Sequence, residues 1–206
     1  MLKKLIIVSA VASLFVSANA EALVSTKHTA SCQTLGNQSG KYPEKKIKGF
    51  SSESLWKKMQ TANQLMADGQ KAQAKQILTE IRNSTKDSYA LSVVNQYLAR
   101  MAFDASDFNG AVRYAAEVID LDALPVEAIL NMKKQLAFAY ASKKDYNNAI
   151  KWLNQYFDQK IKPLVSDYKM LASLYGQNKQ YKKAVCPTYM ALKGAEKPKE
   201  KESLYK

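Results

Sequence analysis

From Ser51 onward, apolar residues recur every three or four positions, the spacing that places them on one face of an α-helix. Gly and Pro are sparse in this part of the chain, and short polar turns separate the apolar stretches. The pattern predicts eight amphipathic helices in four pairs. Their predicted ranges are 52–67 with 70–83, 87–103 with 107–121, 125–142 with 146–160, and 164–177 with 181–193.

The helix pairs repeat a common sequence skeleton. LAFAYASKKDYNNAI at 136–150 returns as LASLYGQNKQYKKAV at 171–185, which is 35 residues further on. A fixed period between about 20 and 50 residues is the signature of a stacked array. Each unit has a small anchor residue early in its second helix, and the spacings between these anchors are 37, 38 and 35 residues. The four anchors are Ala74, Ala111, Ala149 and Ala184.

A helix–turn–helix unit of this length is the tetratricopeptide (TPR) pattern. Antiparallel helices need small residues where their backbones approach, so we expect Ala99, Ala137 and Ala172 to face the last three anchors. Aromatic residues near the turns should fill the wedge between neighbouring pairs. These are Phe108, Tyr146 and Tyr181. One pair cannot cover its own apolar face, so the sequence predicts an all-α fold, an α-solenoid of about four TPR-like repeats over residues 51–206.

Several residues mark predicted helix ends. Asp145 can cap the helix that begins at Tyr146, Pro125 suits a helix first turn, and Gly194 is a C-terminal stop. Pro187 conflicts with a regular final helix, so either that helix starts late or its neighbours tolerate a kink. Pro198 should open a further repeat helix that the chain does not complete, so we expect a longer native protein or a truncated copy.

The first 50 residues differ from the rest of the chain. Lys3 and Lys4 precede an apolar run at 5–16, and Ala18-Asn19-Ala20 follows, so residues 1–20 read as a cleaved secretory signal peptide. Twelve apolar residues span about 18 Å as a helix, too short for roughly 30 Å of bilayer core. Residues 21–50 are polar and aperiodic, which predicts a flexible leader.

The exported chain is strongly basic. Because Lys3 and Lys4 leave with the signal peptide, 29 of the 31 basic residues and all 18 acidic residues remain, a net charge of +11. Nearly all the basic residues are Lys. A solvated lysine-rich surface explains this composition, and attraction to anionic partners in the cell envelope is the alternative. Export argues against nucleic acid as the ligand.

Two cysteines, Cys32 and Cys186, remain in the exported chain. In an oxidising compartment they could pair, since the 18 residues from Cys32 to Phe50 can stretch about 60 Å and reach the fourth repeat. Two free or separately oxidised thiols are equally compatible with the sequence. The sequence therefore leaves both states open.

Four stretches resemble one group of TPR proteins: DALPVEAI (122–129), DYNNAIKWLNQYF (145–157), QYKKAVCPTYMAL (180–192) and KPKEKESLYK (197–206). They are similar to exported TPR proteins encoded beside TonB energy-transduction systems in Gram-negative bacteria. The resemblance accounts for Pro187, because such proteins carry a proline soon after the anchor alanine. It implies a periplasmic accessory role in TonB-dependent uptake through protein contact, in a family that typically continues for several more repeats.

The chain offers little material for catalysis. Its one histidine, His28, lies in the predicted leader, and no zinc-ligand spacing, phosphate loop or hydrolase motif occurs. We therefore expect no enzyme activity, no metal and no cofactor.

What remains is a surface that can bind a partner. In TPR arrays the first helix of each pair lines a groove, and we expect this groove to have a Met- and aromatic-rich start and a basic far end. Such a groove suits an extended or helical peptide with apolar anchors and some acidic character. The predicted groove residues are Trp56, Met59, Asn63, Met66, Gln96, Arg100, Phe103, Asn131, Lys134, Phe138, Lys169, Ser173 and Gln177.

Two alternatives stay open at this point. Phe103 and Phe138 could instead pack against the adjacent repeat. The protein could also bind an anionic cell-envelope polymer, peptidoglycan or lipid headgroups, through its lysines. The first hypothesis is a periplasmic scaffold or adaptor for a protein or peptide partner, with its oligomeric state left open.

Overall fold

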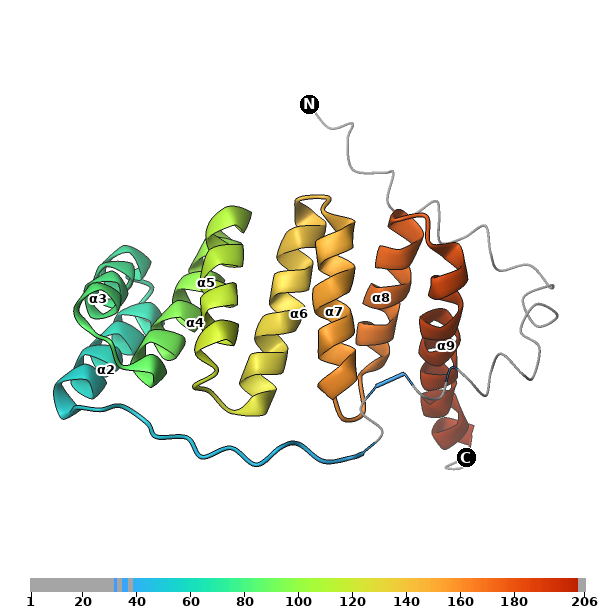
Figure 1. Cartoon of the computed structure of the whole chain (residues 1–206), viewed down its shortest axis with the longest axis horizontal. Helices are drawn as coiled ribbons and strands as arrows, with labels where there is room; N and C mark the ends of the chain where they lie inside the picture. The colour runs from blue at the N-terminus through green and yellow to red at the C-terminus, as the bar shows by residue number, and fades with distance from the viewer. Residues whose placement is uncertain (1–31, 33–34, 37–38, 204–206) are drawn as a thin grey trace.

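The structure is a computed structural model that describes residues 32, 35–36 and 39–203, with only the backbone described from 195 onward. This part of the chain is all-helical, and its helices stand in one row as an α-solenoid (Figure 1). The predicted signal peptide, residues 1–20, lies outside the described residues. No helix in the described part combines the length and the apolar character that a membrane crossing needs.

The helices pair as the sequence predicts. They are α2 (Glu53–Ala67), α3 (Lys71–Ser84), α4 (Ser88–Asp104), α5 (Phe108–Leu121), α6 (Val126–Ser142), α7 (Tyr146–Gln159), α8 (Val165–Gln177) and α9 (Tyr181–Ser203). The first seven agree with their predicted ranges to within one residue at each end. The Asp145 cap is confirmed, since its carboxylate accepts a hydrogen bond from the Asn148 N–H at 3.2 Å. Pro125 is the residue immediately before α6.

The turn inside each repeat has the same backbone shape. One residue takes a left-handed conformation, and it always lies five residues before the anchor alanine. The next backbone N–H then donates to a first-helix carbonyl at 2.8–2.9 Å, which closes the turn. The left-handed residues are Gly69 (φ 77°), Ser106 (58°), Lys144 (62°) and Lys179 (58°). Glycine is the residue that usually marks a left-handed turn position, and only the first repeat has glycine there. The repeated turn therefore cannot be recognised from residue type.

The apolar core is divided among the junctions between repeats. One cluster joins α2 and α3 to α4, a second joins α4 and α5 to α6, and a third joins α6 and α7 to α8 and α9. Each repeat therefore buries its apolar face against the next one, as a solenoid requires.

Burial of the small residues changes at the last repeat. Ala74, Ala111 and Ala149 are fully buried, whereas Ala184 is half-buried. The turn aromatic Tyr181 is 67% exposed, so the prediction that it fills a wedge between repeats is wrong. No further repeat follows α9 in the described chain to cover that position.

Helix α9 is longer than predicted. It runs unbroken through Pro187, Gly194 and Pro198, so the predicted stop at Gly194 and the new helix at Pro198 are both wrong. Gly194 instead allows α9 to lie close to the start of α8, because an added Cβ would lie 2.5 Å from Val165 Cγ2. Pro187 is buried in the helix, which begins at Tyr181 and therefore does not start late.

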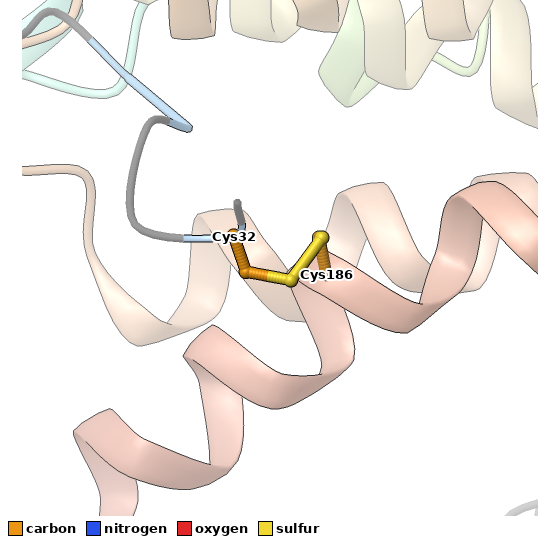
Figure 2. Close-up of a disulfide and its surroundings, with 2 residues drawn as sticks. All are labelled: Cys32 and Cys186. Carbon is orange, nitrogen blue, oxygen red and sulfur yellow. A yellow bond between two sulfur atoms is a disulfide. The ribbon is translucent and has the colours of Figure 1, made fainter. Parts of the chain in front are cut away.

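Cys32 and Cys186 form a disulfide, which resolves the alternative that the sequence leaves open (Figure 2). The two Cα atoms are 4.9 Å apart although the residues are 154 positions apart in the chain. Cys186 belongs to α9. The disulfide therefore attaches the chain before the first repeat to the last repeat.

Residues 39–51 then run back along the row of helices to α2; we call this segment the strap (Figure 1). It follows the loop edge, which we define as the connections between repeats at 84–88, 121–126 and 159–165. The Tyr42 hydroxyl donates to the Glu127 carboxylate, which also pairs with Lys160 at 2.7 Å. Lys45 pairs with Asp122. The sequence predicts residues 21–50 to be a flexible leader, and it gives no sign of these contacts.

The end of the strap is attached to the first two repeats. The Ser51 N–H donates to Asp87 Oδ2 at 2.6 Å, and the other oxygen of Asp87 caps α4. The Phe50 ring lies edge-on to Tyr89 at 5.1 Å and tilted against Trp56 at 5.6 Å between ring centroids. The strap thus contacts the first three repeats.

Candidate functional site

We call the exposed sides of the first helices, α2, α4, α6 and α8, the groove face. Between α4 and α6 this face has an open hollow of about 310 Å³. Two phenylalanines, one acidic side chain, one basic side chain and one amide line it. They are Arg100, Phe103, Asp104, Gln135 and Phe138.

The two phenylalanines lie side by side across the boundary between repeats two and three. Their ring centroids are 5.8 Å apart, and Phe103 also meets Phe108 edge-on at 6.1 Å. Phe138 is nevertheless 54% exposed. The expected packing of these rings against the adjacent repeat is therefore present, and it leaves an aromatic surface open on the groove face.

Polar groups surround this aromatic surface. Arg100 Nε pairs with Asp104 Oδ1 at 3.2 Å one helical turn away, and both side chains are largely exposed. This pair uses one of the five guanidinium donors, so the outer nitrogens of Arg100 can bind a carboxylate. Gln135 Oε1 is buried and has no hydrogen-bond partner among the described residues.

A second hollow, of about 420 Å³, lies between repeats one and two. Met66, Tyr97 and Met101 give it an apolar wall, and Lys71 and Lys75 form a basic rim. Arg100 and Asp104 border both hollows. The first hollow therefore lies on the groove face, and the second adjoins it where α3 meets α2 and α4.

One predicted groove residue is wrong. Met59 is 1% exposed and belongs to the core between α2, α3 and α4. It lies three residues before Ala62, which is also fully buried, and residues at this spacing share a helix face. The sequence therefore already contained the signal that places Met59 in the core.

Lys134 forms an ion pair, which reduces the basic character that we expect at the far end of the groove. Its Nζ is 3.0 Å from Oδ1 of Asp167, which is only 2% exposed. Asp167 also accepts from the Tyr156 hydroxyl at 2.5 Å and from the Leu164 N–H at 2.9 Å. Burial first, and then the hydrogen bond to Asp167, raise the pKa of the Tyr156 hydroxyl far above its usual range. Lys134 thus neutralises a buried carboxylate and helps to hold α6 against α8.

The remaining predicted residues lie where the helical spacing places them. Trp56, Asn63, Asn131, Lys169, Ser173 and Gln177 are exposed, while Met66 and Gln96 are half-buried. The structure brings Arg100, Phe103 and Phe138 together in the first hollow, and Met66 joins Arg100 in the second.

Sequence reasoning missed eight residues that line the two hollows: Lys71, Ala72, Lys75, Tyr97, Met101, Asp104, Ala105 and Gln135. Asp104 carried a usable signal, because it follows Arg100 by one helical turn. In the described residues no cluster of three or more His, Cys, Asp or Glu side chains is placed to hold a metal ion.

Comparison with known proteins identifies the fold. No protein-family model and no curated protein matches the chain. Two crystal structures of nearly identical TPR-like repeats, assigned to a kinesin light chain of Podosopora anserina, are similar to it. One, a point variant, has a TM-score of 0.55 at 23% identity and covers 71% of this chain and 76% of that chain. The other has a TM-score of 0.56 at 21% identity and covers 74% and 80%. The fold is thus a TPR-like α-solenoid.

Proposed function

We propose that this protein is a non-catalytic periplasmic scaffold that binds an extended or helical segment of a protein partner on its groove face. The observation that carries the proposal is the open aromatic pair Phe103 and Phe138 in the hollow between α4 and α6. Half-exposed aromatic rings in a depression are typical anchors for a partner's apolar side chains.

The groups around the hollow define the segment that would fit. An apolar side chain of the segment would lie against Phe138, and a carboxylate near it would meet the outer nitrogens of Arg100. Gln135 lines the hollow, and a rotation of its side chain would bring the amide oxygen to an N–H of the segment. The ligand class is therefore a peptide with an apolar anchor next to an acidic group.

Two features support an extracytoplasmic location. The predicted signal peptide directs export, and the disulfide between Cys32 and Cys186 is of a kind that persists in oxidising compartments. The resemblance to TPR proteins encoded beside TonB systems makes TonB-dependent uptake the process that we propose the scaffold serves. N-terminal sequencing of protein from a periplasmic fraction should begin at Glu21, and recovery of reduced, unprocessed protein from the cytoplasm would refute this location.

The groove assignment can be tested by capture of partners from solubilised envelope. We expect Phe138→Ala to lower recovery of a specific partner about tenfold, as loss of an interface hot spot does. Leu164→Ala is a matched control, because Leu164 is similarly exposed, at 60%, but lies just before α8 and away from both hollows. If the two variants recover the partner equally well, the partner does not bind in the groove.

Salt separates this function from binding of an anionic envelope polymer. Attachment through exposed lysines alone weakens steeply from low to moderate ionic strength, whereas apolar anchoring in the groove persists. Binding that vanishes at moderate salt and ignores Phe138→Ala would favour the polymer. For the TonB link, deletion of the protein should impair growth on a substrate that requires TonB-dependent uptake, with TonB-independent growth as the control.

A further inference from the structure

The second hollow, of about 420 Å³, has an apolar wall that the fold does not cover. Met66 of α2 and Tyr97 and Met101 of α4 form this wall, and all three are half-buried. The hollow lies between repeats one and two, both of which the structure describes, so it is not an unfinished end of the row. A depression of this size with a mostly apolar lining is typical of a binding site.

The next two repeats show what occupies this position elsewhere in the row. With the anchor alanines aligned, Lys71 of the first repeat corresponds to Phe108 and Tyr146, and Met66 corresponds to Phe103. Phe108 meets the ring of Phe103 edge-on at 6.1 Å between centroids, and Tyr146 packs half-buried against the next core cluster. Because Lys71 and Met66 both line the second hollow, this hollow lies where the internal repeats place a turn aromatic ring.

The rim of the second hollow carries positive charge that the chain does not neutralise. Lys71 and Lys75 lie one turn apart on α3, both are exposed, and neither forms an ion pair in the described chain. The one acidic side chain of the lining, Asp104, already pairs with Arg100. Asp68, in the turn before α3, does not line the hollow. The lining thus has three basic side chains and one acidic side chain, a net charge of +2.

We propose that the second hollow binds an aromatic side chain of the protein partner together with an acidic residue beside it in the partner's sequence. The ring would take the place of the missing turn aromatic and would lie against Met66 and Met101, since thioether sulfur makes favourable contacts with aromatic rings. The acidic group would meet Lys71 and Lys75. The inference rests on the scaffold function proposed above, and it adds a contact outside the hollow between α4 and α6.

The probe for the test is the blocked tripeptide acetyl-Glu-Phe-Glu-amide. Methyl NMR of the methionines in the full-length oxidised protein gives a local readout, because Met66 and Met101 line the hollow while Met132 and Met170 belong to other junctions. The probe should shift the Met66 and Met101 signals in a saturable way and leave the other two in place. Acetyl-Lys-Phe-Lys-amide and acetyl-Glu-Ala-Glu-amide, the matched controls, should each bind at least about fivefold more weakly.

Variants at the rim separate shape from charge. Lys71→Phe supplies the ring that the internal repeats have, so it should fill the hollow and abolish the shift of Met101. Lys71→Gln combined with Lys75→Gln keeps the hollow and removes two charges, so the acidic and basic probes should then bind almost equally. Circular dichroism should show that both variants keep their helices. Phe138→Ala should leave probe binding unchanged, because Phe138 is not part of this hollow.

Three results overturn the inference: no saturable shift of Met66 and Met101, equal affinity of the wild-type protein for the acidic and basic probes, or unchanged binding in Lys71→Phe. A shift of the same signals by phosphatidylglycerol but not by the tripeptide also overturns it, and would assign the hollow to a lipid. The scaffold proposal fails separately. If the probe binds here but Phe138→Ala does not lower partner capture, the groove assignment alone is wrong. If Phe138→Ala lowers capture and the probe does not bind, the present inference alone is wrong.

Discussion

At the loop edge an ion pair joins the strap to the repeats, whereas on the groove face the ion pairs of Arg100 and Lys134 lie among the repeats themselves. Lys45 and Lys160 meet Asp122 and Glu127 at the edge, but Lys169 on the groove face has no ion pair in the described chain. The same lysine-rich composition therefore serves two purposes. At the loop edge Lys45 attaches the strap to the repeats, and on the groove face Lys169 stays exposed to the partner that we propose.

The aromatic residues show the same contrast. Phe50 at the end of the strap is packed between Trp56 and Tyr89, while Phe138 on the groove face is more than half exposed. An aromatic ring that is packed by its own chain stabilises the fold, and one that is open can bind another molecule. The comparison predicts that changes at the loop edge affect stability and that changes on the groove face affect binding.

Removing the disulfide should give the largest effect on stability. We expect the double variant Cys32→Ser, Cys186→Ser to lose roughly 2–5 kcal/mol of unfolding free energy, because the crosslink closes a very long loop in the unfolded chain. Urea denaturation of the oxidised protein and the variant measures the difference. Reductant should lower the wild-type midpoint and leave that of the variant unchanged, and identical midpoints for the two oxidised samples would contradict the role given to the disulfide.

Substitution of two lysines on the groove face should lower the unfolding free energy by very different amounts. Lys134→Met should lose about 2 kcal/mol, less than the usual cost of breaking a fully buried pair, because Lys134 is itself one-third exposed. Lys169→Met should stay within about 0.5 kcal/mol. Thermal or urea unfolding of both variants gives the comparison. Adding Asp167→Asn to Lys134→Met should recover part of the loss, and equal costs for the two lysines would refute the structural role of Lys134.

Acid should weaken the loop edge. Burial alone would raise the pKa of Glu127, but hydrogen bonds from Lys160 and Tyr42 outweigh it and hold this pKa below its ordinary value of 4.5. Burial opposes ionisation of Asp87 as well, yet hydrogen bonds from Ser51, Ala90 and Tyr89 lower its pKa below 3.8.

A lowered folded-state pKa contributes stability that is present above the ordinary value and is lost as the pH falls through the folded value. We therefore expect the unfolding free energy to decline below about pH 4.5. Glu127→Gln should cost at most about 1 kcal/mol at pH 7, because the pair is half exposed, and it should flatten this decline. Urea titrations between pH 7 and pH 3 test both points, and an unchanged pH profile in the variant would be the negative result.

The smallest change in stability should come from the groove face. Phe138→Ala should alter the unfolding free energy by no more than about 0.5 kcal/mol, as exposed positions usually do. Phe157→Ala, at a ring that is 1% exposed, is the contrasting variant and should cost about 3–5 kcal/mol. If both cost the same, Phe138 belongs to the core and the groove face has lost its main candidate anchor.

Local patterns predict the helices well because helical periodicity and caps such as Asp145 act within a few residues. The end of α9 was not predictable in this way. Gly194 and Pro198 are usual signs of a helix end, but Gly194 is needed where α9 passes Val165 at close range. That distance is a property of packing between α8 and α9, and no local pattern reports it.

The candidate site was predictable only in part, for a similar reason. Arg100, Phe103 and Phe138 follow from helical spacing, since it sets which residues face the groove. The pairing of Lys134 with Asp167 spans 33 residues and depends on how α6 lies against α8. The strap has no periodicity at all, so its contacts along the loop edge became visible only in the folded chain.

The disulfide also changes what a break in the backbone does. Cys32 and Cys186 close a covalent ring that includes nearly all of the helical row. A protease that cuts one connection within this ring leaves both fragments joined through sulfur, so the molecule stays in one piece. Two cuts are needed before any part of the ring can leave, so a single cleavage of the backbone releases no fragment from it.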